Sequence, residues 1–501
     1  MLRQEGSAAS VQEDVREKDM KRATISSLFW KLFEQGGASV ISLVVQIVMA
    51  RLLAPEEFGM LAIMLVFVNI GNVVVQSGLN TAIIQSPDAT ERDYSTVFWM
   101  SLTMSVVLYG ISFVAAPAVA AFYDMPQVVT PLRVLVLVLV VNAYNSIQEA
   151  IVARALEFKK TARATVAAGV VSGCAGVAVA VLGGGIWALV VQQLLFQVTK
   201  CVVLALEITW KPHLVFDRHR AVVLFRFGWK LLASGVLDQG YQSLADLIIG
   251  KQFNKTDLGF VSQGKKYPFA VGALLDGAIQ PVVLSAASRV QDDVAMVKRL
   301  ARRGLKTSTF LIFPAMTLFA LTAEPIVSML LGDKWLPSVP ILQAYCFIYA
   351  LLPIHTTNLQ VLNGMGRSDL FLKLEVIKNV VGLAILCVAA FVFDTIFAII
   401  AGYVLTGVLC TFINAFPNRR VIGYDFSEQV RDILPAFLLS LAAAAVASPL
   451  ALLPVGGLPL IVLQALAMVV AYLGIARLLR VEELTYILNT LGELRGKRTA
   501  K

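Results

Sequence analysis

The residues best suited to bind a ligand are two adjacent lysines, Lys265 and Lys266, which stand in an otherwise apolar stretch. A lysine at the centre of a membrane helix costs on the order of 2.5–3.5 kcal/mol on insertion scales, so an embedded base is expected to have a compensating role. A compact ammonium group binds phosphate as a point charge. The pair therefore predicts an anionic ligand. Neighbouring residues point about 100° apart on a helix, so the two lysines cannot face it equally.

Seven further bases lie inside apolar stretches, but most of them stand within two turns of an expected helix end. Long basic side chains at such positions reach the membrane surface by snorkelling, and this reading is favoured for them. These bases are Lys31, Arg133, Lys200, Arg226, Lys230, Lys306 and Lys378.

Two of the expected helices carry a polar stripe on one face. Polar groups that faced lipid would go unsatisfied, so the stripes are expected to face protein or a water-filled cavity that binds the ligand. Hydrogen bonding between helices is the alternative for the serine and glutamine positions. The stripes consist of Lys31, Gln35, Ser39, Ser42 and Gln46, and of Lys230, Ser234, Asp238 and Tyr241.

Embedded acids offer a second kind of chemistry. Asp238, Asp246 and Asp276 are candidates for ion coupling, although charge pairing with a nearby lysine is favoured. The three histidines are too scattered for a metal site, no cofactor motif is present, and no nucleophile stands beside a base. We therefore expect neither an enzyme nor a cofactor-dependent protein.

The elements that position these residues are membrane helices. Apolar residues make up 58% of the chain and charged residues only 15%, against roughly 25% charged in soluble domains. A bilayer core needs roughly 20 apolar residues per helix. The apolar runs predict an all-α, multi-pass membrane protein with about fourteen transmembrane helices, near 27–50, 59–84, 95–120, 131–152, 164–184, 186–206, 228–250, 259–287, 305–331, 337–361, 371–392, 395–416, 432–452 and 457–478.

The distribution of basic residues predicts the orientation. Segments on the side of the termini hold 29 lysines and arginines, and the opposite loops hold 4. Because cytoplasmic loops carry the basic excess, both termini are expected in the cytoplasm. The net charge of +9 is then a topology signal, and no nucleic-acid partner is expected.

An internal repeat of about 200 residues organises the chain, because Trp30-Lys31-Leu32 recurs as Trp229-Lys230-Leu231. Six helices separate the copies, so the two halves are parallel repeats. The positions of Lys265 and Lys266 hold Leu65 and Val66 in the first copy, so the basic pair breaks the repeat. We predict an N-terminal tail (1–26), a six-helix bundle (27–210), a cytoplasmic connection (211–227), a second six-helix bundle (228–420), two added helices (421–478) and an amphipathic basic tail (479–501).

Several segments, in order along the chain, resemble the colanic-acid-exporter branch of the bacterial Wzx-type polysaccharide flippases. They are LAPEEFG at 53–59, AIIQ at 82–85, RALEFK at 154–159, DLIIG at 246–250, GDKWLP at 332–337 and NGMGRS at 363–368.

The resemblance implies a member of the multidrug, oligosaccharidyl-lipid and polysaccharide exporter superfamily, in the bacterial cytoplasmic (inner) membrane. It implies alternating access and a substrate that is an oligosaccharide repeat unit on undecaprenyl pyrophosphate. Membrane lipids and the polysaccharide polymerase machinery are the further partners expected. Related lipid II flippases also carry cavity bases early in the eighth helix, where Lys265 and Lys266 stand. Residues 260–264 (FVSQG) depart from the family's usual small-residue and tyrosine pattern.

Two alternatives remain. A cation-coupled multidrug antiporter of the same superfamily would bind cations against carboxylates, whereas embedded bases outnumber acids here. A non-transporting scaffold of a polysaccharide-assembly complex would use the amphipathic tail for docking.

Overall fold

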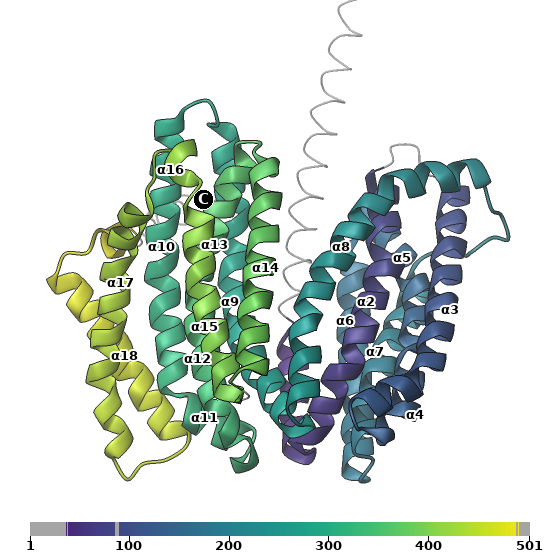
Figure 1. The fold of residues 1–501 in the computed structure, drawn as a ribbon, viewed down its shortest axis with the longest axis horizontal. Coiled ribbons are helices and arrows are strands. Elements are labelled where there is room, and N and C mark those ends of the chain that lie inside the picture. The colour runs from purple at the N-terminus through teal and green to yellow at the C-terminus, as the bar shows by residue number, and fades with distance from the viewer. Residues whose placement is uncertain (1–36, 38, 86–89, 394, 487–488, 490–501) are drawn as a thin grey trace, which may run out of the picture. The chain divides into compact units, whose positions relative to one another are not determined.

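The structure is a computed structural model that describes residues 37, 39–85, 90–393, 395–486 and 489 (Figure 1). The described chain is helical throughout, without a strand, and the all-α membrane fold is confirmed. Eleven of its helices are long and apolar enough to cross a membrane. The helix Ser39–Leu52 and the long helices α8 and α9 would bring the number to fourteen, which stays a prediction.

The chain divides into two compact units, Met1–Lys251 and Gln252–Lys501. The predicted domain boundaries stay predictions. After the helix Ser39–Leu52, the helices of the first unit are α2 (Pro55–Gln85), α3 (Glu91–Phe122), α4 (Val129–Leu135), α5 (Leu137–Ala155), α6 (Phe158–Val181), α7 (Ile186–Glu207) and α8 (Arg218–Gln252), with a 3-10 turn, Pro126–Val128, before α4.

In the first unit α5 is the central helix, since it packs against α2, α3 and α7, while α6 and α7 form a hairpin. The α6–α7 turn contains Gly183 and Gly185 at φ 78° and 52°, in the left-handed region that favours glycine. At one end of the unit Phe98, Tyr144 and Trp210 form an aromatic cluster within the core. Trp210 belongs to the segment that leads into α8, so the cluster packs this segment against the core of the first unit.

α8 is attached to α3 near both of its ends. Arg220 donates two hydrogen bonds to the Asp93 carboxylate, at 2.7 and 2.9 Å. At the other end Lys251 Nζ donates to the carbonyl of Phe122 at 2.6 Å, and Tyr123 Oη donates to that of Leu247. These contacts explain why α8 belongs to the first compact unit.

The second unit packs α9 against α10, α12 and α13, and α10 against α17. α17 and α18 pair with each other at the end of the chain. The helices of this unit are α9 (Lys255–Arg289), α10 (Val294–Leu321), α11 (Ala323–Leu330), α12 (Val339–Ala350), α13 (Leu352–Gly364), α14 (Ser368–Phe391), α15 (Ile396–Ala415), α16 (Asn418–Val421), α17 (Phe426–Ala447) and α18 (Leu458–Leu478), with 3-10 turns at Asp333–Ser338 and Ser448–Leu452.

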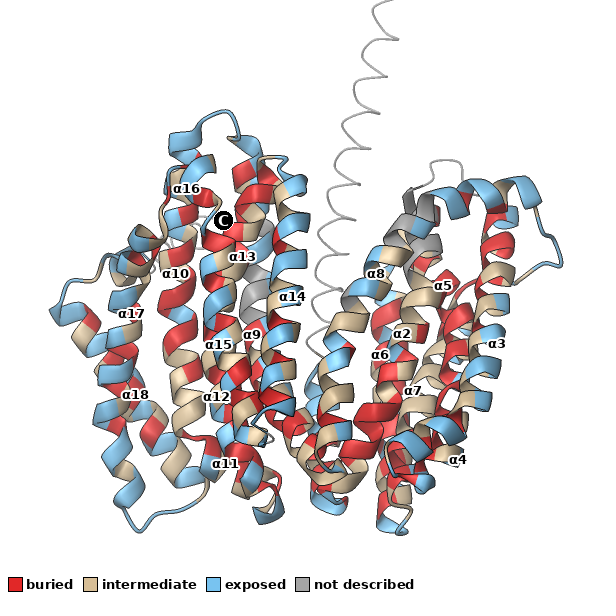
Figure 2. Ribbon diagram, viewed as in Figure 1, coloured by how far each residue is buried: buried red, intermediate tan, exposed pale blue. Residues whose placement is uncertain are grey.

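Many helices have an exposed face (Figure 2), and large apolar residues lie on these faces. On α3, Val106, Ile111 and Val114 are more than half exposed, as are Leu466 and Val470 on α18. A soluble monomer does not tolerate apolar patches of this extent, whereas lipid covers them. The membrane assignment is thus visible in the burial pattern as well as in helix length.

Candidate functional site

The basic pair lies well inside α9. Asn254 caps this helix by accepting a hydrogen bond from the backbone N–H of Asp257 at 2.8 Å, and this bond sets where the helix starts. At 1.5 Å per residue, Lys265 and Lys266 stand about 15 Å along the helix axis from Lys255. A bilayer core is about 30 Å thick, so this distance corresponds to about half of its depth.

One face of α9 packs tightly against α12. A Cβ atom on Gly264 would lie 2.8 Å from Cγ2 of Ile341 and 3.3 Å from the backbone nitrogen of Leu342. Val261 and Pro268, on the same face, are buried. Pro268 has no N–H, so the Gly264 carbonyl loses its usual helical donor. The predicted bend at Pro268 stays a prediction.

Lys266 points away from this packed face. It belongs to a stripe of exposed residues at helical spacing, which the second unit leaves uncovered. Lys265 is partly buried beside it. The predicted difference in orientation within the pair is therefore present in α9. The exposed stripe comprises Lys266, Phe269, Ala270, Ala273, Gly277 and Gln280.

No acidic side chain that the structure describes lies within ion-pair distance of Lys265 or Lys266. Other embedded bases do have such partners. Lys200 on α7 lies 2.5 Å from Glu149 on α5, and Lys378 lies 2.6 Å from Glu375, both on α14. The basic pair on α9 therefore differs from these structural ion pairs.

The first polar stripe is only partly described. Gln46 is buried, and its Oε1 has no hydrogen-bond partner among the described residues. Ser39 and Ser42 are exposed, while Lys31 and Gln35 lie outside the described residues. An adjacent face of this helix packs on α6 through two glycines: a Cβ on Gly169 would lie 2.9 Å from Ile41, and one on Gly173 would lie 2.4 Å from Val45. Small residues at four-residue spacing allow such close helix contact.

The second stripe lies on α8. Tyr241 and Asp246 are partly buried and each has an interaction partner. The side chains of Lys230, Asp238 and Asp276 lie outside the described residues. The roles predicted for these five residues stay predictions.

The structure adds a buried amide network that the sequence did not single out. Asn142 on α5 donates a hydrogen bond to Asn72 of α2 at 2.8 Å, and Asn145 donates to Asn142 and to the backbone carbonyl of Gln197 on α7. Asn142 and Asn145 are almost completely buried. Asparagines in a valine- and leucine-rich run were the signal available in the sequence. The network joins three helices at the centre of the first unit.

A comparable network joins three parts of the second unit. Asn358 on α13 exchanges hydrogen bonds with Gln429 of α17 at 2.8 and 3.0 Å, and Asn418 donates to Asn358 at 2.6 Å. Nearby, His355 lies within hydrogen-bond distance of Thr411 and Asn414 on α15. His355 is thus a partly buried packing residue with amide and hydroxyl partners.

Comparison with known proteins agrees with this architecture. A family model described as "Polysaccharide biosynthesis protein" matches residues 48–340. The teichuronic acid biosynthesis protein TuaB of Bacillus subtilis is 24% identical over 75% of this chain and 78% of its own length. The lipopolysaccharide biosynthesis protein WzxC of Escherichia coli is 21% identical over 88% and 90%, and the succinoglycan biosynthesis transport protein ExoT of Rhizobium meliloti is 22% identical over 70% and 71%.

Among solved structures, the lipid II flippase MurJ in an inward closed conformation has a TM-score of 0.74, at 13% identity, over 91% of this chain and 98% of MurJ. An inward-facing multidrug resistance MATE transporter of the MOP superfamily has a TM-score of 0.59, at 15% identity, over 77% and 95%. These likenesses show the fold. The family match covers more than half of the chain and confirms the resemblance found in the sequence, so this protein belongs to the polysaccharide biosynthesis protein family.

Proposed function

We propose that this protein is a flippase, which carries oligosaccharide repeat units linked to undecaprenyl pyrophosphate across the bacterial cytoplasmic membrane for exopolysaccharide or lipopolysaccharide synthesis. Its family, its membrane fold and relatives named for polysaccharide biosynthesis and transport support this proposal. The proposed orientation places both termini in the cytoplasm, on the basic side of the chain. Polysaccharide polymerase machinery is the proposed recipient of the product.

The observation that carries the proposal is the lysine pair about a third of the way along α9, which has no acidic partner among the described residues. Two unit charges 4 Å apart attract by about 4 kcal/mol at an effective dielectric constant of 20. A pyrophosphate group therefore offers enough attraction to offset the cost of an embedded base. A cationic drug would be repelled by the same residues, so this pair disfavours a multidrug antiporter despite the shared fold.

In this proposal the pyrophosphate pairs with Lys265 or Lys266 while the lipid tail stays in the bilayer. The glycan passes the polar stripes, where Lys31, Gln35, Gln46, Lys230 and Tyr241 offer hydrogen bonds. A change between inward-open and outward-open states then exposes the glycan on the other side. Such transport needs only a ligand-biased equilibrium between two states and no covalent step. These residues therefore bind the substrate and are not catalytic.

The acids of α8 and α9 have a supporting part in the proposal. We assign Asp238, Asp246 and Asp276 to charge pairing with neighbouring bases, in preference to ion coupling. An ion-coupled cycle would make transport depend on the gradient of one cation, which a vesicle assay measures directly.

The test is export by the double variant Lys265→Ala/Lys266→Ala. We expect the fraction of lipid-linked oligosaccharide accessible from outside to fall at least about ten-fold, since each 1.4 kcal/mol of lost binding is a factor of ten. The matched control is Lys211→Ala/Lys373→Ala, which removes the same charge from two exposed positions. Lys265→Arg/Lys266→Arg, which keeps the charge, should retain part of the export.

Membrane levels of each variant are measured alongside export. Normal export by the double alanine variant would refute the substrate-binding role of the pair. Loss of cationic dye efflux without accumulation of inner-leaflet oligosaccharide would favour the multidrug alternative. Correctly flipped intermediates after deletion of the whole protein would favour the scaffold alternative.

A further inference from the structure

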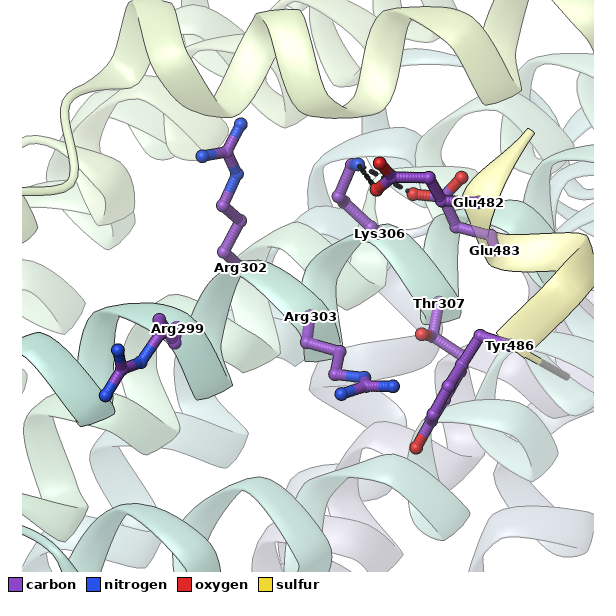
Figure 3. Close-up of a pocket in the computed structure, with 8 residues that line it drawn as sticks. All are labelled: Arg299, Arg302, Arg303, Lys306, Thr307, Glu482, Glu483 and Tyr486. Atoms are coloured by element: carbon purple, nitrogen blue, oxygen red, sulfur yellow. Dashed lines mark ion pairs between the residues drawn. The ribbon is translucent and has the colours of Figure 1, made fainter. Parts of the chain in front are cut away.

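A basic pocket lies in the second unit, between the start of α10 and the short C-terminal helical segment that begins at Glu482 (Figure 3). Its volume is about 570 Å³ and it is open to the outside. Four bases from successive turns of α10 line it, together with Thr307 and three residues of the C-terminal segment. The lining residues are Arg299, Arg302, Arg303, Lys306, Thr307, Glu482, Glu483 and Tyr486.

From the length of α10 we place the pocket at the level of the lipid head groups. α10 has 28 residues, which span about 42 Å and therefore exceed the roughly 30 Å hydrocarbon core. The basic residues begin in its second turn, and a polar start of this kind suits the head-group layer better than the hydrocarbon core, so the excess length is assigned to this end. Leu478 and Leu479, just before the C-terminal segment, are 82% and 67% exposed and offer apolar surface next to the pocket.

Two of the four bases are already held by acids. Arg302 lies 2.7 Å from Asp432 of α17, and Lys306 lies 2.8 Å from Glu483 and 3.6 Å from Glu482. Figure 3 shows Arg302 pointing to the opposite side of α10 from Arg303. These two pairs connect α10 to α17 and to the C-terminal segment, and they build the walls of the pocket.

The other two bases, Arg299 and Arg303, have no acidic partner in the described chain. Arg303 stacks on the ring of Tyr486, with its guanidinium carbon 3.6 Å from the ring centroid, and Arg299 Nη2 lies 3.8 Å from the sulfur of Met296. The two residues are one helical turn apart and point to the same side of α10. Like charges at this spacing repel each other, and an anion between them would remove the repulsion.

We propose that Arg299 and Arg303 bind the phosphate of an anionic phospholipid, with Tyr486 as a third contact and the acyl chains on the neighbouring apolar surface. Guanidinium groups match phosphate in a bidentate geometry, and basic pockets between membrane helices on the cytoplasmic side suit anionic head groups. With the proposed orientation, the lipid comes from the cytoplasmic leaflet. Its binding would fasten the C-terminal segment to α10, independently of the substrate.

The test measures binding of phosphatidylglycerol to the purified full-length protein by native mass spectrometry, with phosphatidylcholine as the neutral reference. We expect Arg299→Gln/Arg303→Gln to weaken phosphatidylglycerol binding at least ten-fold. The control Arg419→Gln/Arg420→Gln removes two exposed arginines from α16, on the same side of the predicted topology. It should change binding less than two-fold. Circular dichroism checks that both variants are folded.

Equal binding by wild type and Arg299→Gln/Arg303→Gln would overturn the proposal. An equal loss in both double variants would also overturn it, because general charge attraction would then suffice. Inorganic pyrophosphate is added as a soluble competitor: displacement of the lipid at micromolar concentration would assign the site to a soluble phosphate compound. Because phosphatidylglycerol is not the proposed substrate, failure here leaves the flippase proposal intact.

Discussion

Removal of the Asp432 carboxylate should loosen α17 from α10. This carboxylate is almost completely buried, and it accepts hydrogen bonds from Arg302 Nη2 and from the hydroxyl of Tyr424, both at 2.7 Å. Burial and the hydrogen bond to Asp432 raise the pKa of Tyr424, so its hydroxyl keeps its proton and remains a donor at neutral pH. The three side chains join the two added helices to the rest of the second unit.

The expected magnitude for Asp432→Ala follows from these contacts. A buried tyrosine hydroxyl left without a partner costs about 1–3 kcal/mol. The bond to Arg302 contributes about 1 kcal/mol, because half of the arginine side chain is exposed to solvent. The total is about 2–4 kcal/mol. Tyr424→Phe leaves the ion pair in place and should cost about 1 kcal/mol.

A double-mutant cycle in detergent, with thermal unfolding followed by tryptophan fluorescence, measures this coupling. Asp432→Ala/Tyr424→Phe should cost about 1–2 kcal/mol less than the sum of the single variants, because the phenylalanine leaves no hydroxyl unsatisfied. Asp369→Ala is the control: this acid is exposed and pairs with Arg367 at the surface, so its loss should cost under about 1 kcal/mol. Additive losses, or an Asp432→Ala variant as stable as wild type, would refute the reasoning.

Two more predictions concern packing in the first unit. Gly173→Ala should destabilise the protein by about 1–3 kcal/mol because its Cβ would lie 2.4 Å from Val45, whereas Gly110→Ala, with no atom within 4 Å, should be neutral or stabilising; equal unfolding temperatures would contradict the close contact. Lys200→Met should lower the unfolding temperature and Lys200→Met/Glu149→Gln should restore most of it, because the double variant leaves no unpaired charge; a double variant less stable than the single would argue against structural pairing.

The sequence by itself determined the class of protein. Long apolar runs and few charges specify membrane helices, because only helices satisfy their own backbone hydrogen bonds in lipid without a closed barrel. The sequence also carried the family resemblance, in short segments such as residues 53–59 and 332–337. The contrast between Lys265 and Lys266 followed from the 100° helical step, and α9 shows it.

Only the tertiary structure decided which polar residues meet. Lys200 and Glu149 are 51 positions apart, and Lys306 and Glu483 are 177 apart, yet each pair is in contact. The sequence counted Arg299 and Arg303 only toward membrane orientation, and it did not show that Tyr486 and two glutamates enclose them. The reason is that helix periodicity gives the face on which a side chain lies, whereas its partner depends on how neighbouring helices rotate and pack, which local sequence does not specify.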